Sequence, residues 1–341
     1  MKYIGNKSRV LDFIEESLKC ENIDYCNKKV LDLFAGTGSV SSFFLSNGCL
    51  VTSCDNMTYS ICEQYRINYF SSEPTFNELS FELNDTTLNG VLSFLNKLEE
   101  KTDYFFENYA PSGKYNRQYF SDENAKKIDA MREKIENWKP FLNKEKYLFL
   151  LGVLMCAADR ISNTSGTYGA YLKIWRSMAL KKIKLEKPEF RSNGKNNIFQ
   201  GDVVDCVKNI KGQDIIYLDP PYNSRQYASN FHVLESICVY DKAELKGKTG
   251  LRNYDSQRSD FCLKNKVYYE FEKLIENCDA KVIVMSYSTE GLLSKEQILS
   301  VLNKKGNCRV YQKEYRRFKT NSWTNGKTDL KELLFICKRK D

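Results

Sequence analysis

Histidine is almost absent from this chain of 341 residues, since His232 is the only one. No two of the twelve cysteines stand in Cys-x-x-Cys spacing, so the sequence offers no basis for a Cys/His zinc site and we expect no metal. Most cysteines lie inside apolar runs, where they act as small hydrophobic residues. We therefore expect reduced thiols in a cytoplasmic protein.

Long apolar segments are also missing. The longest run, residues 147–158, is too short to cross a bilayer and ends at Asp159 and Arg160. Hydrophobic residues still make up 42% of the chain, which is enough for a large core. The length favours one large α/β domain with a substantial insertion. The net charge of +8 is spread along the chain and suits a polyanionic partner.

Residues 215–222, Ile-Ile-Tyr-Leu-Asp-Pro-Pro-Tyr, are the stretch around which we expect the fold to be organised. The first four residues are typical of a buried strand. Two prolines cannot donate to a sheet, so the chain must leave it at Asp219. A carboxylate, the Pro220 carbonyl and the Tyr222 ring then lie at the carboxyl end of a strand, where open α/β sheets bind ligands.

This combination suits methylation of an amino group on a planar ring. The Asp219 carboxylate and the Pro220 carbonyl are acceptors that can hold the two N–H groups of an exocyclic amine and orient its lone pair. The Tyr222 ring can stack on the base. The competing interpretation is a proline-stiffened turn with no chemical role.

Residues 30–39, Val-Leu-Asp-Leu-Phe-Ala-Gly-Thr-Gly-Ser, predict a strand, a glycine turn and the start of a helix. The turn lacks the third glycine of the dinucleotide fingerprint. It suits a ligand that bears a carboxylate, such as S-adenosylmethionine, near the helix N-terminus. The cofactor candidates here are Asp32, Phe34, Gly36 and Gly38.

Three other places add cofactor candidates. Asp55 ends the next expected strand and can accept from ribose hydroxyls or cap the following helix. Asp202 follows a short strand and would lie beside the adenine of the cofactor. At the N-terminus, Gly5 allows close backbone approach between Tyr3 and Lys7, although this segment also reads as an ordinary chain start.

Residues 76–195 interrupt the β–α alternation with helical patterns over 89–101, 122–138 and 144–161. We expect a catalytic domain formed by residues 1–75 and 196–341, and an inserted helical target-recognition subdomain formed by residues 76–195. Polar and basic segments outside the helices supply candidate DNA contacts, with solvated loops as the alternative. These candidates are Arg160, Tyr168, Lys173, Arg225, Gln226, Tyr227, Lys246, Lys248, Arg252, Arg316, Arg317 and Lys319, the last three leading into a basic C-terminal hairpin.

Taken in their order along the chain, these motifs resemble those of the alpha-group DNA adenine-N6 methyltransferases, which include Dam-type and type II restriction–modification enzymes. The resemblance rests on residues 3–7, the glycine turn 34–38, Asp55 and the tetrapeptide 219–222, and it covers most of the chain. It implies a Rossmann-like methyltransferase sheet with a C-terminal antiparallel hairpin. It also implies that Tyr3, Lys7, Asp55 and Asp219 contact S-adenosylmethionine.

The resemblance further implies that Asp219, Pro220 and Tyr222 handle an adenine flipped out of duplex DNA, with a cognate restriction endonuclease as a further partner. Two alternatives stay open from the sequence. One is an RNA or protein amino-group methyltransferase, because related loops methylate other planar amines. The other is a DNA regulator that binds the cofactor without turnover, although such a protein would have no need of the acid, prolines and ring.

Overall fold

The computed structural model describes residues 7–190, 196–314 and 331–340. Seven strands form one sheet in the order β3-β2-β1-β4-β5-β7-β6. The strands are β1 Lys29–Leu33, β2 Leu50–Asp55, β3 Asn196–Gln200, β4 Ile215–Leu218, β5 Val282–Ser288, β6 Gly306–Glu314 and β7 Lys331–Arg339. β1 to β5 pair in parallel, whereas β7 is antiparallel to both β5 and β6. The predicted Rossmann-like sheet with an antiparallel C-terminal hairpin is therefore confirmed.

The strand order reverses between β1 and β4. β1 pairs with β2 on one side and with β4 on the other, so the chain leaves these two neighbouring strands in opposite directions. A crevice forms where such connections diverge, at the carboxyl ends of the strands. The glycine turn after β1 and the proline loop after β4 meet at this point.

Helices cover both faces of the sheet because its central strands are buried on both sides. In β4, Tyr217 packs with α1 and α2 on one face, whereas Ile216 and Leu218 pack with α8, α11 and α12 on the other. The helices of this part are α1 Leu11–Cys20, α2 Ser39–Ser46, α3 Thr58–Gln64, α8 Val203–Asn209, α9 Tyr227–Asn230, α10 His232–Val239, α11 Val267–Asn277 and α12 Lys295–Leu302.

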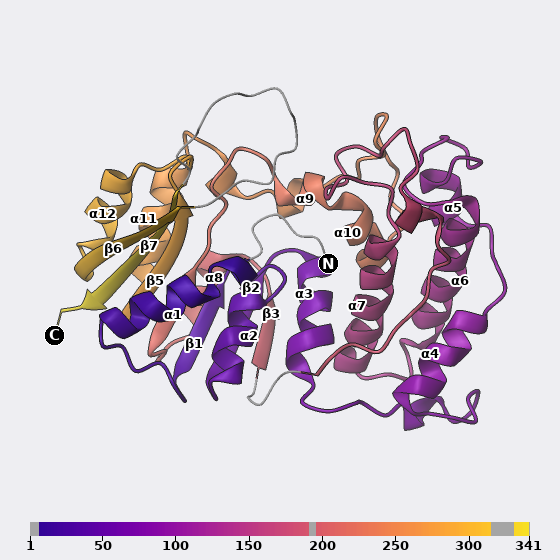
Figure 1. Cartoon of the computed structure of the whole chain (residues 1–341), viewed down its shortest axis with the longest axis horizontal. Coiled ribbons are helices and arrows are strands. Elements are labelled where there is room, and N and C mark those ends of the chain that lie inside the picture. The colour runs from indigo at the N-terminus through magenta and orange to yellow at the C-terminus, as the bar shows by residue number, and fades with distance from the viewer. Residues whose placement is uncertain (1–6, 191–195, 315–330, 341) are drawn as a thin grey trace.

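The segment between α3 and β3 contributes helices α4 Leu88–Lys97, α5 Tyr104–Tyr109, α6 Asp122–Trp138 and α7 Lys144–Arg160. Side-chain caps start the two longest helices, since Ser121 accepts from the Asn124 N–H and Asn143 from the Lys146 N–H. Figure 1 shows these helices on the right and the sheet on the left, with α3 and α10 between them. α3 and α10 share one continuous hydrophobic core with α4–α7. The predicted division into two domains at residues 75 and 196 stays a prediction.

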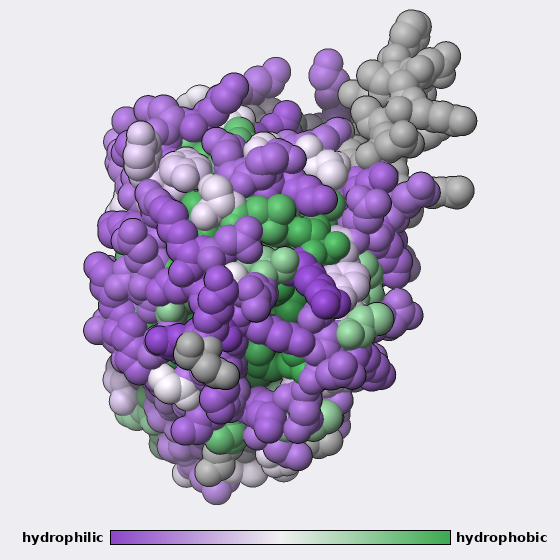
Figure 2. Space-filling view, turned by 90° about the vertical axis from the view of Figure 1, so that its left-hand side faces the viewer, coloured by the Kyte–Doolittle hydropathy of each residue, from purple (hydrophilic) through white to green (hydrophobic). Residues whose placement is uncertain are grey.

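The face that carries α11, α12 and β6, shown in Figure 2, is mostly hydrophilic around an island of hydrophobic side chains. Among the described helices, none combines the length and the apolar character that crossing a bilayer requires. Cys54 at the end of β2 and Cys206 in α8 form a disulfide. The expectation that all cysteines are reduced thiols is wrong for this pair, because the fold brings together two residues 152 positions apart.

Gly38 is the residue on which the glycine turn depends. Its φ of +70° lies in the left-handed region, and a Cβ there would lie 2.5 Å from Asn68 Nδ2. The Asn68 amide donates in turn to the Gly38 carbonyl at 3.0 Å. No other residue type satisfies both constraints at the start of α2.

We expect Gly38→Ala to lower the free energy of unfolding by about 2–4 kcal/mol, through backbone strain plus the collision with Asn68. The matched control is Gly212→Ala, because Gly212 has a φ of +71° and no atom within 4 Å of the place that an added methyl group would take. The control should lose only about 1–2 kcal/mol in urea denaturation. Equal losses in the two variants would show that the contact with Asn68 does not constrain this position.

Candidate active site

A cavity of about 740 Å³ opens at the carboxyl ends of β1, β2, β3 and β4. This volume is in the usual range for small-molecule sites. A much smaller pocket adjoins it between the glycine turn and β4, and Phe34 and Asp219 line both. Other predicted cofactor residues, Asp55 and Asp202, line the large cavity, whereas Lys7, Asp32 and Gly36 line the small one. The structure thus brings together predicted residues from five separate segments.

Acidic groups dominate the wall of the large cavity. Among the described residues, its acids are Asp55, Asp202, Asp205, Asp219, Asp255, Asp260 and Glu270, against three basic residues, Arg258, Lys266 and Lys273. Lys266 is paired with Asp260 at 3.0 Å. The cavity therefore carries the opposite sign to the whole chain, whose net charge is +8. Such a cavity favours a cationic ligand and repels phosphate groups.

Asp219 is the acid that links the two cavities. Its side chain is 15% exposed, and its Oδ1 lies 3.1 Å from Lys7 Nζ without a hydrogen-bond partner among the described residues. Burial raises the pKa of Asp219 to about 6, with Lys7 acting in the opposite direction and Glu332 adding to the rise. Oδ1 is enclosed against Lys7, so the remaining, partly exposed part of the Asp219 carboxyl group is what can accept a hydrogen bond from a ligand in the cavities.

The loop after Asp219 is held by β5, the strand next to β4, and by the loop that follows it. The Leu292 N–H donates to the Tyr222 carbonyl at 3.1 Å, and the Tyr222 ring meets the edge of Tyr287 at a centroid distance of 6.4 Å. Lys7 Nζ lies 5.8 Å from the centroid of the Tyr222 ring. Pro220 and Pro221 are buried. The half-buried Tyr222 ring and the Asp219 carboxyl group therefore share Lys7 as a neighbour, although Tyr222 is not among the residues that line either cavity.

The acids at the ends of β1 and β2 also have raised pKa values. Burial raises the pKa of Asp32 to about 7, although Ser41 Oγ donates to it at 2.5 Å, and the charges of Asp219 and Asp55 add to the rise. Burial likewise raises the pKa of Asp55 to about 6. The two Asp55 oxygens accept from the Gly36 and Met57 N–H groups, both at 2.8 Å.

These bonds give Asp55 a role in holding the glycine turn. Each carboxylate oxygen keeps a further lone pair, so the predicted bond to ribose hydroxyls is compatible with them. The alternative prediction, that Asp55 is the N-cap of the next helix, holds only in part. Met57 occupies the N-cap position of α3, and Asp55 accepts a hydrogen bond from the Met57 N–H. Asp202 caps α8 by accepting from the Val204 N–H at 2.8 Å.

Phe34 adopts a φ of +62°, a strained conformation for an aromatic residue that costs about 1–3 kcal/mol. Its ring meets Phe261 edge-on at 5.0 Å, and both rings line the large cavity. The strain turns an apolar ring toward the place where β1, β2 and β4 end. Such strain at a ligand cavity is typical of functional sites.

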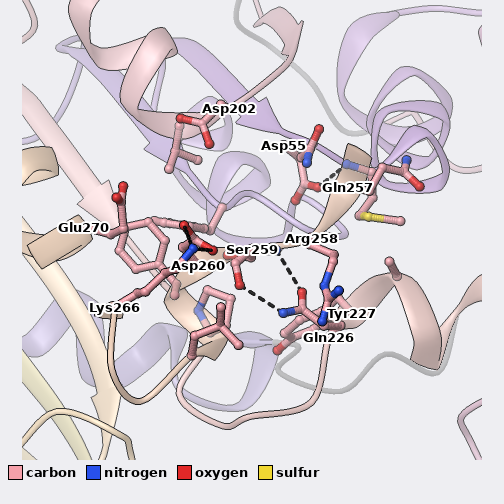
Figure 3. A pocket seen from close by; sticks show the side chains of 18 of the residues that line it. Asp55, Asp202, Gln226, Tyr227, Gln257, Arg258, Ser259, Asp260, Lys266 and Glu270 are labelled. Atoms are coloured by element: carbon pink, nitrogen blue, oxygen red, sulfur yellow. Dashed lines mark hydrogen bonds and ion pairs between the residues drawn. The ribbon is translucent and has the colours of Figure 1, made fainter. Parts of the chain in front are cut away.

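Residues 255–262 form the outer wall of the cavity and were not predicted from the sequence. Gln226 fixes this wall, because its Nε2 donates to the Ser259 carbonyl at 2.9 Å and its Oε1 accepts from the Ser259 N–H at 2.8 Å (Figure 3). Gln257 donates to the buried Glu235, which also accepts from the first N–H groups of α3. No local sequence signal marks these contacts, since each joins distant segments.

Three of the predicted DNA contacts are corrected by the structure. Tyr168 is fully buried, and its hydroxyl donates to Asp159 at 3.0 Å. Arg252 is 7% exposed and paired with Asp241 at 2.7 Å. Gln226 uses both ends of its amide on Ser259. These polar side chains hold loops together because a buried polar group must find its partner inside the protein.

The remaining predicted DNA contacts divide into three groups. Lys173, Arg225, Lys246 and Lys248 are exposed, and Tyr227 is half-buried at the cavity. Arg160 is exposed but forms an ion pair with Glu186. Arg316, Arg317 and Lys319, together with the cofactor candidates Tyr3 and Gly5, lie outside the described residues.

Comparison with known proteins gives one consistent family. Residues 3–301 match the family model of the D12 class N6 adenine-specific DNA methyltransferases. The chain is 38% identical over 330 residues to the type II methyltransferase M.NlaIII of Neisseria lactamica, covering 95% of this chain and 94% of that protein. It is 36% identical over 339 residues to M.CviAII of Paramecium bursaria Chlorella virus 1, covering 98% and 97%.

A third relative is longer than this chain. M.FokI of Planomicrobium okeanokoites is 37% identical over 349 residues, which cover 99% of this chain and 53% of that protein. Among solved structures, a magnesium protoporphyrin IX methyltransferase from Synechocystis PCC 6803 is 8% identical with a TM-score of 0.35, covering 97% and 79%, too distant to add to the fold described above. On the family match and these sequence relatives, the chain belongs to the D12 class N6 adenine-specific DNA methyltransferases.

Proposed function

We propose that Asp219, the Pro220 carbonyl and Tyr222 hold an adenine extruded from duplex DNA while its N6 is methylated at a specific site. The observation that carries this proposal is the Asp219 carboxyl group, whose side chain is 15% exposed and which lines both cavities at the carboxyl end of β4. An N6 amine that donates to Asp219 and to the Pro220 carbonyl has its lone pair directed away from both acceptors. Extrusion is required because a stacked base cannot reach a buried cavity.

The residues around the two cavities fit S-adenosylmethionine, the methyl donor of this family. The cofactor has a net charge of +1, which matches the acidic wall. Its carboxylate can accept from N–H groups at the N-terminus of α2, and the Phe34 and Phe261 rings can flank its adenine. When bound, it supplies a methyl group that leaves a sulfonium sulfur, with the bonding electrons remaining on the sulfur.

The chain's own contribution is position and charge. The N6 lone pair forms the new bond, so N6 carries a positive charge until it loses a proton. The adjacent Asp219 carboxylate stabilises this charge, and the buried loop excludes water. The Tyr222 ring, braced by Tyr287, supplies the surface on which the adenine stacks.

Two exposed loops of the helical part are well placed to contact the DNA backbone. The Tyr119 hydroxyl contacts the carbonyl oxygens of Tyr168 at 2.7 Å and Thr249 at 2.9 Å, which joins the loop 161–176 to the loop 246–252. Arg117 donates to the Gly247 and Lys248 carbonyls. The loop 246–252 is thereby anchored, while the side chains of Lys246 and Lys248 remain exposed.

The other loop reaches the cavity through α9. The Tyr168 N–H donates to the carbonyl of Asn230 at the end of this helix, whose first residues line the large cavity. Both loops gather at the upper edge in Figure 1, the edge at which α9 lies. We assign the exposed Lys173, Lys246, Lys248 and Arg225 to phosphate contacts beside the extruded base. Residues 76–195 then serve target recognition.

The biological setting is part of the proposal. Relatives named as type II and modification methylases support a role in a restriction–modification system with a cognate endonuclease acting on the same site. Such an enzyme works in the cytoplasm. Incubating duplex DNA of random sequence with labelled S-adenosylmethionine and mapping N6-methyladenine tests the whole assignment, and label in RNA or protein alone would contradict it.

We expect Asp219→Ala to reduce kcat by about a hundredfold or more, because the N6 amine loses both its orienting acceptor and the neighbouring negative charge. DNA binding, measured by gel shift, should stay near that of the native enzyme. Asp205→Ala is the matched control, an exposed acid on the wall of the same cavity. Full methylation activity in the Asp219 variant would refute its role.

Tyr222 separates stacking from hydrogen bonding. We expect Tyr222→Phe to keep most of the activity, because the ring remains, and Tyr222→Ala to lose about ten- to a hundredfold in kcat/KM, since base stacking is worth about 1–3 kcal/mol. Single-turnover methylation of one duplex measures both variants. Similar losses in the two variants would assign the function to the hydroxyl instead.

Cofactor affinity should depend on pH. Asp32, Asp55 and Asp219 have raised pKa values of about 7, 6 and 6, so the empty cavity gains protons as the pH falls through this range. A bound cation opposes this protonation, so by linkage S-adenosylmethionine should bind several-fold more weakly for each pH unit between about 7 and 5. Calorimetry measures the trend.

S-adenosylhomocysteine is the control ligand because it lacks the sulfonium charge. Its affinity should change less over the same pH range. Parallel pH profiles for the two ligands would show that the acidic wall does not recognise the sulfonium.

A further inference from the structure

Two carboxylates share one buried ammonium group beside the proline loop. Lys7 Nζ lies 2.6 Å from Glu332 Oε1 and 3.1 Å from Asp219 Oδ1. The side chains of Lys7 and Glu332 are only 7% and 10% exposed. The resemblance assigned Lys7 to the cofactor, and no local pattern in the sequence drew attention to Glu332, because 325 positions separate it from Lys7.

The two contacts of the ammonium group differ in kind. Lys7 Nζ donates a hydrogen bond of 2.6 Å to Glu332, whereas Asp219 Oδ1 lies farther away, at 3.1 Å, as the weaker ion-pair partner. Burial opposes a charged Lys7, but Asp219 and Glu332 raise the pKa of Lys7 well above its ordinary value. Lys7 therefore stays cationic, and with both acids ionised the three groups sum to one negative charge.

We propose that Glu332 is a positioning residue for methyl transfer: it binds the Lys7 ammonium so that Asp219 keeps an acceptor for N6, and it leaves the cluster net negative. Without Glu332, the Lys7 ammonium group would form an ion pair with Asp219 alone. Asp219 would then be a neutralised partner, less able to stabilise the positive charge that N6 gains. This inference rests on the proposed role of Asp219.

The other groups that face Asp219 do not replace Glu332. Tyr217 shares a hydrogen bond of 2.7 Å with Ser286, and burial raises the pKa of its phenol well above the ordinary value, so it stays neutral. Asp32 is close enough for the charge of Asp219 to raise its pKa. Among the described residues, Lys7 is thus the cation and Glu332 the second acid whose charges act on Asp219.

Glu332→Gln tests the proposal because it keeps the shape of the side chain and an acceptor for Lys7 but removes the charge. The charge of Glu332 raises the pKa of Asp219, so its removal should move the acid limb of kcat/KM, which reports the free enzyme, to lower pH by about half a unit or more. The plateau of kcat should fall by roughly ten- to a hundredfold, with the KM for DNA changed less than about threefold.

Two further variants make the test independent of any one substitution. Lys7→Gln should displace the acid limb in the opposite direction, to higher pH, since Lys7 lowers the pKa of Asp219. Glu332→Asp keeps the negative charge. The acid limb of its kcat/KM profile should therefore stay near the native pH, and its plateau value of kcat should be higher than that of Glu332→Gln. If circular dichroism shows that Glu332→Gln does not fold, these two variants still decide the matter.

Glu21→Gln is the matched control for a purely structural acid. Glu21 is 6% exposed and binds Lys338, near the far end of β7 from Glu332. It should lower Tm without moving the acid limb. Native kinetics in Glu332→Gln would overturn the inference. So would a lower plateau of kcat with the acid limb of kcat/KM at its native pH, as expected for Glu21→Gln. The proposed function does not depend on this test: it would still stand after a negative result for Glu332, provided that Asp219→Ala is inactive in the same assays.

Discussion

A carboxylate at the end of β4 that is buried without a full set of hydrogen bonds is the constraint on which this structure depends. Taking Asp219 out of water raises its free energy, and the cost is tolerable only because a cation stands 3.1 Å away. That cation comes from residue 7 and is itself bound by residue 332. The two ends of the described chain must therefore meet at the middle of the sheet before the site exists.

The outside of the protein and the wall of the cavity carry charges of opposite sign, and each sign suits a different ligand group. A net charge of +8 attracts a polyanion to the outside of the protein, while the acidic wall of the cavity repels phosphate. In the proposed function, a nucleotide would enter the cavity by its uncharged base, with its phosphates on the exposed Lys and Arg side chains assigned to phosphate contacts. The same acidic wall favours a cationic methyl donor, so one electrostatic arrangement selects both ligands.

Much of the site could be predicted because its motifs are local. Proline at positions 220 and 221 ends β4, and the glycines at 36 and 38 bend the chain into α2, so sequence order alone places these loops at one edge of the sheet. The helical pattern predicted over residues 122–138 coincides with α6, which the Ser121 side chain caps in the structure.

The contacts that were not predicted from the sequence share one physical cause. Tyr168, Arg252 and Gln226 look like polar surface residues in the sequence, yet each is bound to a partner inside the protein. Glu332, Tyr119 and the wall formed by residues 255–262 gain their roles from segments that only folding brings together. Composition shows that a side chain can donate or accept, and only the tertiary fold shows what it contacts.

The continuous core formed by α3, α10 and the inserted helices has a consequence for the evolution of specificity. Because α10 begins ten residues after Tyr222 and lies in this core, the helical part and the proline loop are coupled through close packing. A recombination event that exchanged residues 76–190 between relatives would have to preserve the facing surfaces of α3 and α10. New target specificities should therefore arise more readily by point changes in the exposed loops than by wholesale exchange of the insertion.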